Sequence, residues 1–327
     1  MSPIINQIIG KNNTLEHHSR KRLPPEPLIL LFSCLGIKIL TNVTGALKGL
    51  HEIADNYDVI LCDIWGVLHN GVARHPEADV ALRKFKGRDK KNIPRVALVT
   101  NMPRPLADVV AMLESLGIGD DAYDAISSSG DVARAEILRY AGKNIRHVGP
   151  SRLESLFAGI DVKLGDAQSA VAIIVSDVDS DIFAAGGYDA EMEIWLARKL
   201  PMICANPDKV VEVGNTLRYC AGALADIYEA RGGEVVMAGK PFAPIYEYAL
   251  KKLEALSVPR ARILSIGDAV RTDAAGAALQ KVDFLFISGS VHAGELATAG
   301  GANDANIEAL IAPTGARLAG HMPMLVW

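Results

Sequence analysis

Short apolar runs alternate with helix-like segments along most of this chain beyond residue 40. Strands are expected at 58–62, 96–100 and 124–127, and helices at 76–86 and 105–116. This alternation is typical of a parallel sheet whose strands are joined by crossover helices, so it predicts an α/β fold. The pattern resumes near residue 234 and ends with a helix-like stretch at 303–312, after which we expect a loose tail.

The middle of the chain reads as a smaller α/β unit of its own. Its strands are expected at 145–149, 170–175 and 202–205, and its helices at 131–141, 150–159 and 189–199. The simplest architecture is a three-layer core domain, residues 41–133 and 234–327, interrupted by an inserted cap domain, residues 134–233.

Composition excludes several classes of protein. Half of the 327 residues are hydrophobic and the net charge is −4, which favours a globular protein and disfavours a nucleic-acid binder with a basic face. Four cysteines match no metal-binding spacing, which favours reduced thiols and a cytoplasmic location. We expect residues 1–40 to be a poorly ordered extension. The apolar run 28–37 is too short to span a bilayer, which needs roughly 20 residues, although association with a membrane surface stays open.

Polar residues follow four of the apolar runs. Asp63 ends the first run, Thr100-Asn101 ends another, Lys240 follows Gly239, and Asp268 precedes Asp273 by five residues. Parallel sheets bind ligands beyond the carboxyl ends of their strands, where these groups would meet. Carboxylates, a hydroxyl and an ammonium together suit metal-assisted phosphoryl transfer through an aspartyl intermediate.

Each of these residues has an ordinary structural explanation when it is taken alone. Asp63 could cap the segment after its strand, and Thr100-Asn101 could start a turn. Lys240 could be a solvated charge, and Asp273 could be the N-cap of a helix over 274–280. The functional interpretation therefore depends on the combination and its order along the chain.

In that combination the chain resembles the haloacid dehalogenase (HAD) superfamily. It is most similar to subclass IIA, the NagD-like and 4-nitrophenylphosphatase-like hydrolases. The matching motifs are Asp63-Ile64-Trp65-Gly66-Val67-Leu68 with Gly71, Thr100-Asn101, Gly239-Lys240-Pro241, Gly267-Asp268 through Thr272-Asp273, Asn206-Pro207-Asp208 and Gly222-Ala223-Leu224. They span roughly residues 45–290. The resemblance implies a Rossmann-like parallel-sheet core with an inserted C2-type α/β cap.

The resemblance also implies roles for individual residues. The implied catalytic residues are Asp63, Thr100 and Lys240, with substrate binding by Thr100, Asn101 and Lys240 and magnesium binding at Asp63, Trp65, Asp268 and Asp273. Asp63 would be the nucleophile, and Trp65 would contact Mg²⁺ through its backbone carbonyl. The implied substrate is a small phosphorylated metabolite, and dimerisation through the cap stays open.

Trp65 is a departure from the family pattern, in which a second aspartate protonates the leaving alcohol (Asp-x-Asp). An indole cannot perform that proton transfer, and general acid–base help contributes about 10²–10⁴-fold. Three explanations are consistent with Trp65: substrates with good leaving groups, an acid supplied by the substrate or the cap, or loss of catalysis with binding retained. His69 is the nearest substitute acid along the chain. The sequence thus predicts a magnesium-dependent hydrolase that the Trp65 replacement would make slow. The alternative is a catalytically weak or inactive phosphometabolite-binding or regulatory protein.

A second Asp-x-Asp sequence lies within the expected cap. Asp177, Asp179 and Asp181 follow the strand at 170–175, but no Thr-Asn pair follows them before Lys240. We therefore interpret this segment as a polar cap loop and not as the reaction centre.

Overall fold

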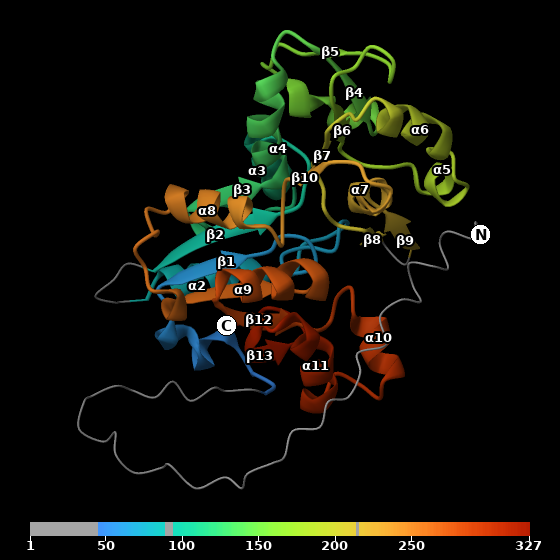
Figure 1. Cartoon of the computed structure of the whole chain (residues 1–327). Helices are drawn as coiled ribbons and strands as arrows, with labels where there is room; N and C mark the ends of the chain where they lie inside the picture. Colours follow the sequence, from blue (N-terminus) through green and yellow to red (C-terminus); the bar gives the residue numbers. More distant parts are fainter. Residues whose placement is uncertain (1–44, 89–93, 214–215) are drawn as a thin grey trace, which may run out of the picture.

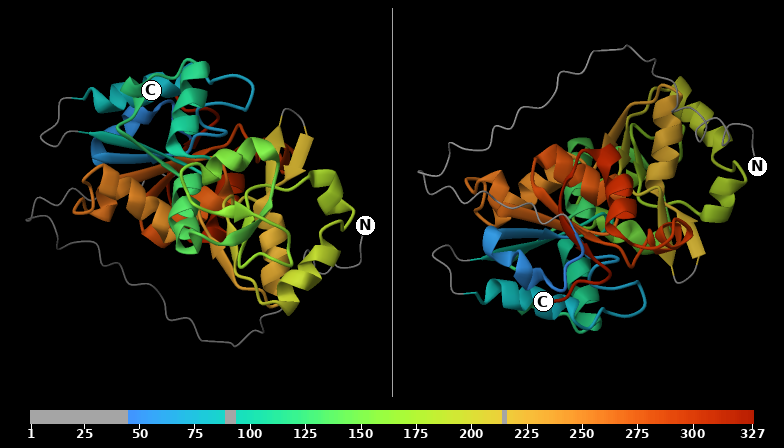
Figure 2. Two further views of the ribbon diagram at one scale, coloured as in Figure 1. Left: turned by 90° about the horizontal axis from the view of Figure 1, so that it is seen from above. Right: turned by 90° about the horizontal axis from the view of Figure 1, so that it is seen from below.

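The computed structural model describes residues 45–88, 94–213 and 216–327 (Figure 1). Its larger sheet has six parallel strands in the order β13-β12-β11-β1-β2-β3. Their bounds are β1 Val59–Cys62, β2 Arg95–Thr100, β3 Ala125–Ser128, β11 Ile263–Gly267, β12 Asp283–Ile287 and β13 Arg317–Met322. Segments from both ends of the described chain form this core together, as the blue-to-cyan and orange-to-red ribbons of Figure 2 show.

Helices cover both faces of the core sheet. They are α2 Ala78–Lys86 and α3 Leu106–Ser115 on one face, and α8 Ala243–Lys252, α9 Ala275–Gln280 and α11 Asp304–Ile311 on the other. Side chains alternate along each strand, so Ile60 and Cys62 pack with the first group while Val59 and Leu61 pack with the second. Because both faces are covered, β1 is apolar and buried at every position. The expected three-layer α/β core is confirmed.

A second, five-stranded parallel sheet forms the cap, in the order β10-β7-β6-β4-β5. Its elements are α4 Ser129–Ile137, β4 Asn144–Val148, β5 Lys163–Leu164, β6 Ile173–Val175, α5 Ser180–Ala184, α6 Asp189–Ala197, β7 Met202–Cys204, α7 Ala221–Ala230 and β10 Val235–Met237. An antiparallel hairpin, β8 Val210–Val213 and β9 Thr216–Tyr219, projects from it. Trp195 and Tyr228 are buried edge to face between α6 and α7. The cap thus has its own apolar core.

The structure corrects three details of the expected layout. The strand at 235–237 pairs with β7 of the cap, so the chain returns to the core after it and not at residue 234. The expected helix at 150–159 is a 3-10 helix, Ser151–Phe157. The expected loose tail contains β13, which pairs with β12 at the edge of the core sheet.

Two further expectations meet the limits of the described chain. The extension 1–40 lies outside the described residues. Among the residues that the structure describes, no helix combines the length and the apolar character needed to cross a bilayer.

Candidate active site

The site lies where the central strands of the core sheet end. Asp63 directly follows β1 and Asp268 directly follows β11, and these strands are paired neighbours. Because the strands are parallel, both carboxylates emerge at the same edge of the sheet, as the sequence pattern predicts. Both side chains are buried, with 7% of Asp63 and 4% of Asp268 exposed.

Lys240 connects two of the acids. Its Nζ lies 2.7 Å from Asp63 Oδ1 and 2.7 Å from Asp273 Oδ1. Burial alone would lower the pKa of Lys240, but the charges of Asp273 and Asp63 raise it well above its usual value. The ammonium is therefore charged at neutral pH, and the bland interpretation of Lys240 as a solvated surface charge is wrong.

Asp63, Asp268 and Asp273 form an acidic trio that fits a divalent cation. Carboxylate oxygens of the three lie within 4.8 Å of one another, and all three side chains are buried. Burial and the charge of Asp273 raise the pKa of Asp63 well above its usual value, and the same two causes raise that of Asp268 to about 7. Lys240 alone therefore leaves excess negative charge here, and hard oxygen ligands of this kind suit Mg²⁺.

Gly66 makes this close approach possible. Its φ is +82°, which favours glycine, and a Cβ at this position would lie 2.0 Å from Asp268 Oδ2. The turn after β1 can therefore bring the backbone onto the acidic trio only with glycine at position 66. Asp273 lies in a single π-helical turn, Val270–Ala274, and its Oδ2 accepts a hydrogen bond from the Ala269 N–H at 3.1 Å.

Thr100 and Asn101 at the end of β2 complete the core side of the site. Asn101 Oδ1 accepts a hydrogen bond from the Lys240 backbone N–H at 2.7 Å. Asn101 Nδ2 donates to Asp208 Oδ1 of the cap at 2.9 Å. Thr100 is buried and its Oγ1 accepts from the Met102 N–H at 3.2 Å, which leaves the hydroxyl proton available to a phosphoryl oxygen.

Trp65 lines the cavity together with Asp63, and its indole packs against Gly71 and His69. A Cβ at Gly71 would lie 2.5 Å from the ring, and His69 contacts the ring edge to face at a centroid distance of 5.1 Å. His69 itself is 1% exposed and its Nδ1 accepts from the Gly71 N–H. Burial, with a contribution from His75, lowers the pKa of His69 to about 4. A role for His69 as the proton donor in place of the missing aspartate is therefore not supported.

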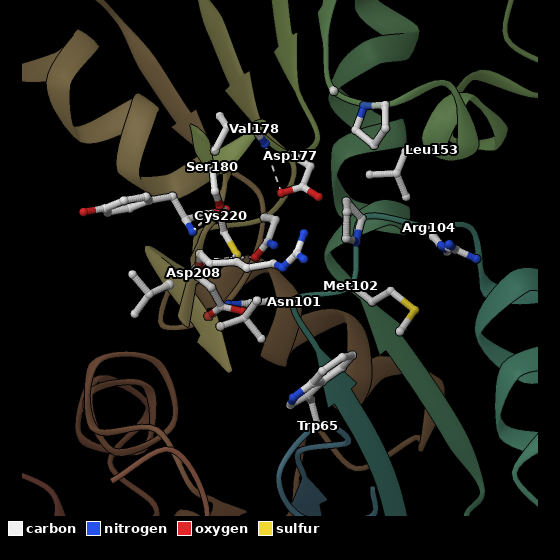
Figure 3. A pocket seen from close by; sticks show the side chains of 18 of the residues that line it. Trp65, Asn101, Met102, Arg104, Leu153, Asp177, Val178, Ser180, Asp208 and Cys220 are labelled. Atoms are coloured by element: carbon white, nitrogen blue, oxygen red, sulfur yellow. Dashed lines mark hydrogen bonds between the residues drawn. The ribbon is translucent and has the colours of Figure 1, made fainter. Parts of the chain in front are cut away.

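A cavity of about 1070 Å³ lies between the core and the cap. Figure 3 shows Trp65 at its core end and Asp177 and Val178 toward the cap, with Asn101 and Asp208 between them. Cap residues that the sequence did not assign to the site also line it, among them Arg152, Arg218 and His147. Asp208 belongs to the Asn206-Pro207-Asp208 motif, for which the sequence predicted no role in the site. Its hydrogen bond with Asn101 places it there. Asp177 contributes to the cap wall, as expected for a polar cap loop.

Comparison with known proteins identifies the family to which this architecture belongs. Residues 60–163 match the model of the haloacid dehalogenase-like hydrolases, and residues 237–317 match that of HAD-hydrolase-like domains. A haloacid dehalogenase-like hydrolase from Brucella suis 1330 is 39% identical, covers 86% of this chain and 100% of its own, and superposes with a TM-score of 0.73. The chain belongs to the haloacid dehalogenase-like hydrolase family.

More distant proteins are also similar to this chain over most of its length. NagD from Escherichia coli K-12 is 21% identical over 82% of this chain and 97% of its own, with a TM-score of 0.59. An acid sugar phosphatase of Staphylococcus saprophyticus is 24% identical over 67% of this chain and 81% of its own length. The resemblance drawn from the motifs is thus confirmed at the level of family and fold.

Proposed function

We propose that the protein is a magnesium-dependent phosphohydrolase that acts on a small phosphorylated metabolite. The observation that carries this proposal is Lys240, whose buried ammonium contacts both Asp63 and Asp273 at 2.7 Å. A protein that only bound a phosphorylated ligand would have no need for a carboxylate held at the floor of its cavity in contact with a buried cation. The sugar phosphatase among the relatives supports sugar phosphates as a first class of substrate to test.

In this proposal Asp63 attacks phosphorus and forms an aspartyl phosphate, which water then hydrolyses. Lys240 neutralises charge on Asp63 and on the phosphoryl group, and Thr100 and the backbone near Asn101 hold that group in place. Asp63 and Asp268, with the Trp65 carbonyl, would hold Mg²⁺, and Asp273 would support the metal site. Bound magnesium supplies charge neutralisation and orientation of the phosphoryl oxygens.

The test is phosphate release from 4-nitrophenyl phosphate and acetyl phosphate, with Mg²⁺ and with EDTA. We expect magnesium-dependent turnover that Asp63→Asn abolishes, together with a trapped phosphoprotein in the wild type only. A suitable control is Asp121→Asn, because Asp121 is a largely exposed surface acid paired with Arg83. Turnover that survives in Asp63→Asn would refute the assignment of the nucleophile.

Trp65 is the specific observation that favours a second candidate, a phosphometabolite-binding protein with little or no catalysis. This alternative expects saturable binding of phosphorylated compounds without phosphoprotein formation. Activity that appears only in Trp65→Asp would support it, because the scaffold would then lack nothing but its acid.

We also propose a cytoplasmic location. Cys62, Cys204 and Cys220 are free and buried, which suits a reducing compartment.

A further inference from the structure

A phosphomonoester with an alkyl leaving group needs a proton donor, and Trp65 cannot supply the proton. The donor must line the cavity, hold a proton near neutral pH and offer it from an atom that is not already hydrogen-bonded. Neither histidine near the site meets these conditions. His69 is buried beneath Trp65, and His147 has its Nε2 2.7 Å from Ser176 Oγ while burial lowers its pKa to about 4.

Three carboxylates of the cap loop line the cavity, those of Asp177, Asp179 and Asp181, and the first two are engaged within the cap. Asp177 lies 3.3 Å from Arg152 at the cap end, away from Trp65 (Figure 3). Asp179 caps helix α5 and accepts hydrogen bonds from two backbone N–H groups at 3.0 Å. Asp181 is exposed in the first turn of α5. Within the described chain, none of these three side chains has a hydrogen bond or ion pair with a residue of the core.

Asp208 is placed differently, because a residue of the core holds it. The Lys240 N–H must donate to Asn101 Oδ1, at 2.7 Å, and this fixes the orientation of the Asn101 amide. Asn101 Nδ2 therefore points to Asp208 Oδ1, at 2.9 Å. Asp208 is thereby linked through Asn101 to Lys240, whose ammonium contacts the nucleophile Asp63.

The second oxygen of Asp208 is free to carry a proton. Within the described chain, Oδ2 receives no hydrogen bond, while the partly exposed side chain lines the cavity. Burial raises the pKa of Asp208, and the charge of Asp273 adds to this, although Lys240 and the hydrogen bond from Asn101 oppose it. The net direction is upward, which is the direction that a general acid requires. Because Oδ1 accepts from Asn101, Oδ2 is the oxygen that would carry the proton.

We propose that Asp208 is the general acid and base of this site, in place of the aspartate that Trp65 replaces. This inference rests on the proposed phosphohydrolase function. In the first step Asp63 forms a bond to phosphorus, the bond to the leaving oxygen breaks, and that oxygen takes the proton of Asp208. The products of this step are an alcohol, an aspartyl phosphate and the Asp208 carboxylate.

In the second step the Asp208 carboxylate accepts a proton from water as the water oxygen attacks phosphorus. The bond between phosphorus and Asp63 breaks, and its electron pair returns to the Asp63 carboxylate. Inorganic phosphate is released and Asp208 is neutral again. The cap thus supplies the proton-transfer group that the core lacks.

The decisive experiment compares two substrates in wild type and in Asp208→Asn, with Mg²⁺ present. Asparagine keeps the oxygen that accepts from Asn101, so the contact between cap and core survives while the transferable proton is lost. 4-Nitrophenyl phosphate has a leaving group that needs no proton, whereas glycerol 2-phosphate has one that does. We expect kcat/KM for glycerol 2-phosphate to fall about 10²–10⁴-fold and that for 4-nitrophenyl phosphate to change less than threefold.

The second step adds an independent readout with 4-nitrophenyl phosphate. Without a base for water, Asp208→Asn should release one equivalent of nitrophenolate in a burst and then turn over slowly, with phosphoprotein accumulating. Asp177→Asn is the matched control, because loss of this cavity acid should change kcat/KM for both substrates by the same factor. Adding Trp65→Asp to Asp208→Asn should restore turnover of glycerol 2-phosphate.

The outcomes separate this inference from the function on which it rests. An equal loss for both substrates in Asp208→Asn, or no loss for either, would overturn the role of Asp208 while the phosphohydrolase stands. Absence of turnover of both substrates in the wild type would overturn both proposals.

Discussion

Replacement of Lys240 by methionine tests the electrostatic account of the site most directly. The side chain is 4% exposed and contacts two buried carboxylates at 2.7 Å. Removing one partner of a buried ion pair costs about 3–5 kcal/mol, because the remaining charges stay desolvated and unpaired. At about 2–4 °C per kcal/mol for a domain of this size, we expect the Tm to fall by roughly 6–20 °C in EDTA.

The assay is thermal unfolding followed by circular dichroism, for wild type and Lys240→Met, in EDTA and in Mg²⁺. Mg²⁺ should raise the Tm of the variant by more than that of the wild type, because the acidic trio then carries more unbalanced negative charge. Lys86→Met is the matched control, since Lys86 forms a partly exposed ion pair with Asp124, 2.9 Å away, worth about 0–1 kcal/mol. Equal Tm losses in the two variants would refute the reasoning.

Three further predictions concern a turn, the cap core and the thiols. Gly66→Ala should lower Mg²⁺ affinity about 10–100-fold in a titration, because its Cβ would lie 2.0 Å from an oxygen of the acidic trio. The control is Gly117→Ala, because Gly117 has a φ of +74° with open space around it, so its substitution should cost only the backbone strain of about 1–3 kcal/mol. Equal Mg²⁺ affinities in the two variants would contradict a clash at position 66. Trp195→Ala should destabilise the fully buried cap core by about 3–5 kcal/mol in urea unfolding, and a loss below 1 kcal/mol would show that the cap tolerates the cavity. Burial raises the pKa of Cys204 to about 12, so in a Cys34→Ser background the native protein should react with iodoacetamide at pH 8 far more slowly than the urea-unfolded chain; matched rates would contradict a buried thiol.

The core of the site could be predicted because it follows from local rules. A buried parallel strand is a continuous apolar run, so the residue after it lies at the sheet edge where ligands bind. This rule was sufficient to predict the positions of Asp63 and Asp268. The charges that metal-assisted phosphoryl transfer requires indicated Lys240 and Asp273. Their contacts at one sheet edge are what the pattern predicted.

Features that depend on distant pairing could not be predicted in the same way. The apolar run at 235–237 does not encode which sheet it joins, and it joins the cap through β7. Strand β13, Arg317–Met322, contains arginine, glycine and histidine, so it lacks the apolar run of a buried strand. The hydrogen bond between Asn101 and Asp208 joins residues 107 positions apart and depends on how the cap meets the core.

The position of Asp208 has a mechanistic consequence that a core acid would not have. In the proposed mechanism the nucleophile lies on the core and the proton donor lies on the cap, so proton transfer depends on the contact between the two domains. Asn101 makes this contact beside Asp208, because it binds the Lys240 backbone on one side and Asp208 on the other. An Asn101→Ala substitution should therefore lower kcat/KM for glycerol 2-phosphate more than that for 4-nitrophenyl phosphate, as Asp208→Asn does. Asp63 and the rest of the acidic trio are unchanged in this variant. An acid carried by position 65 would be insensitive to this contact, so a Trp65→Asp variant should lose that selective dependence on Asn101.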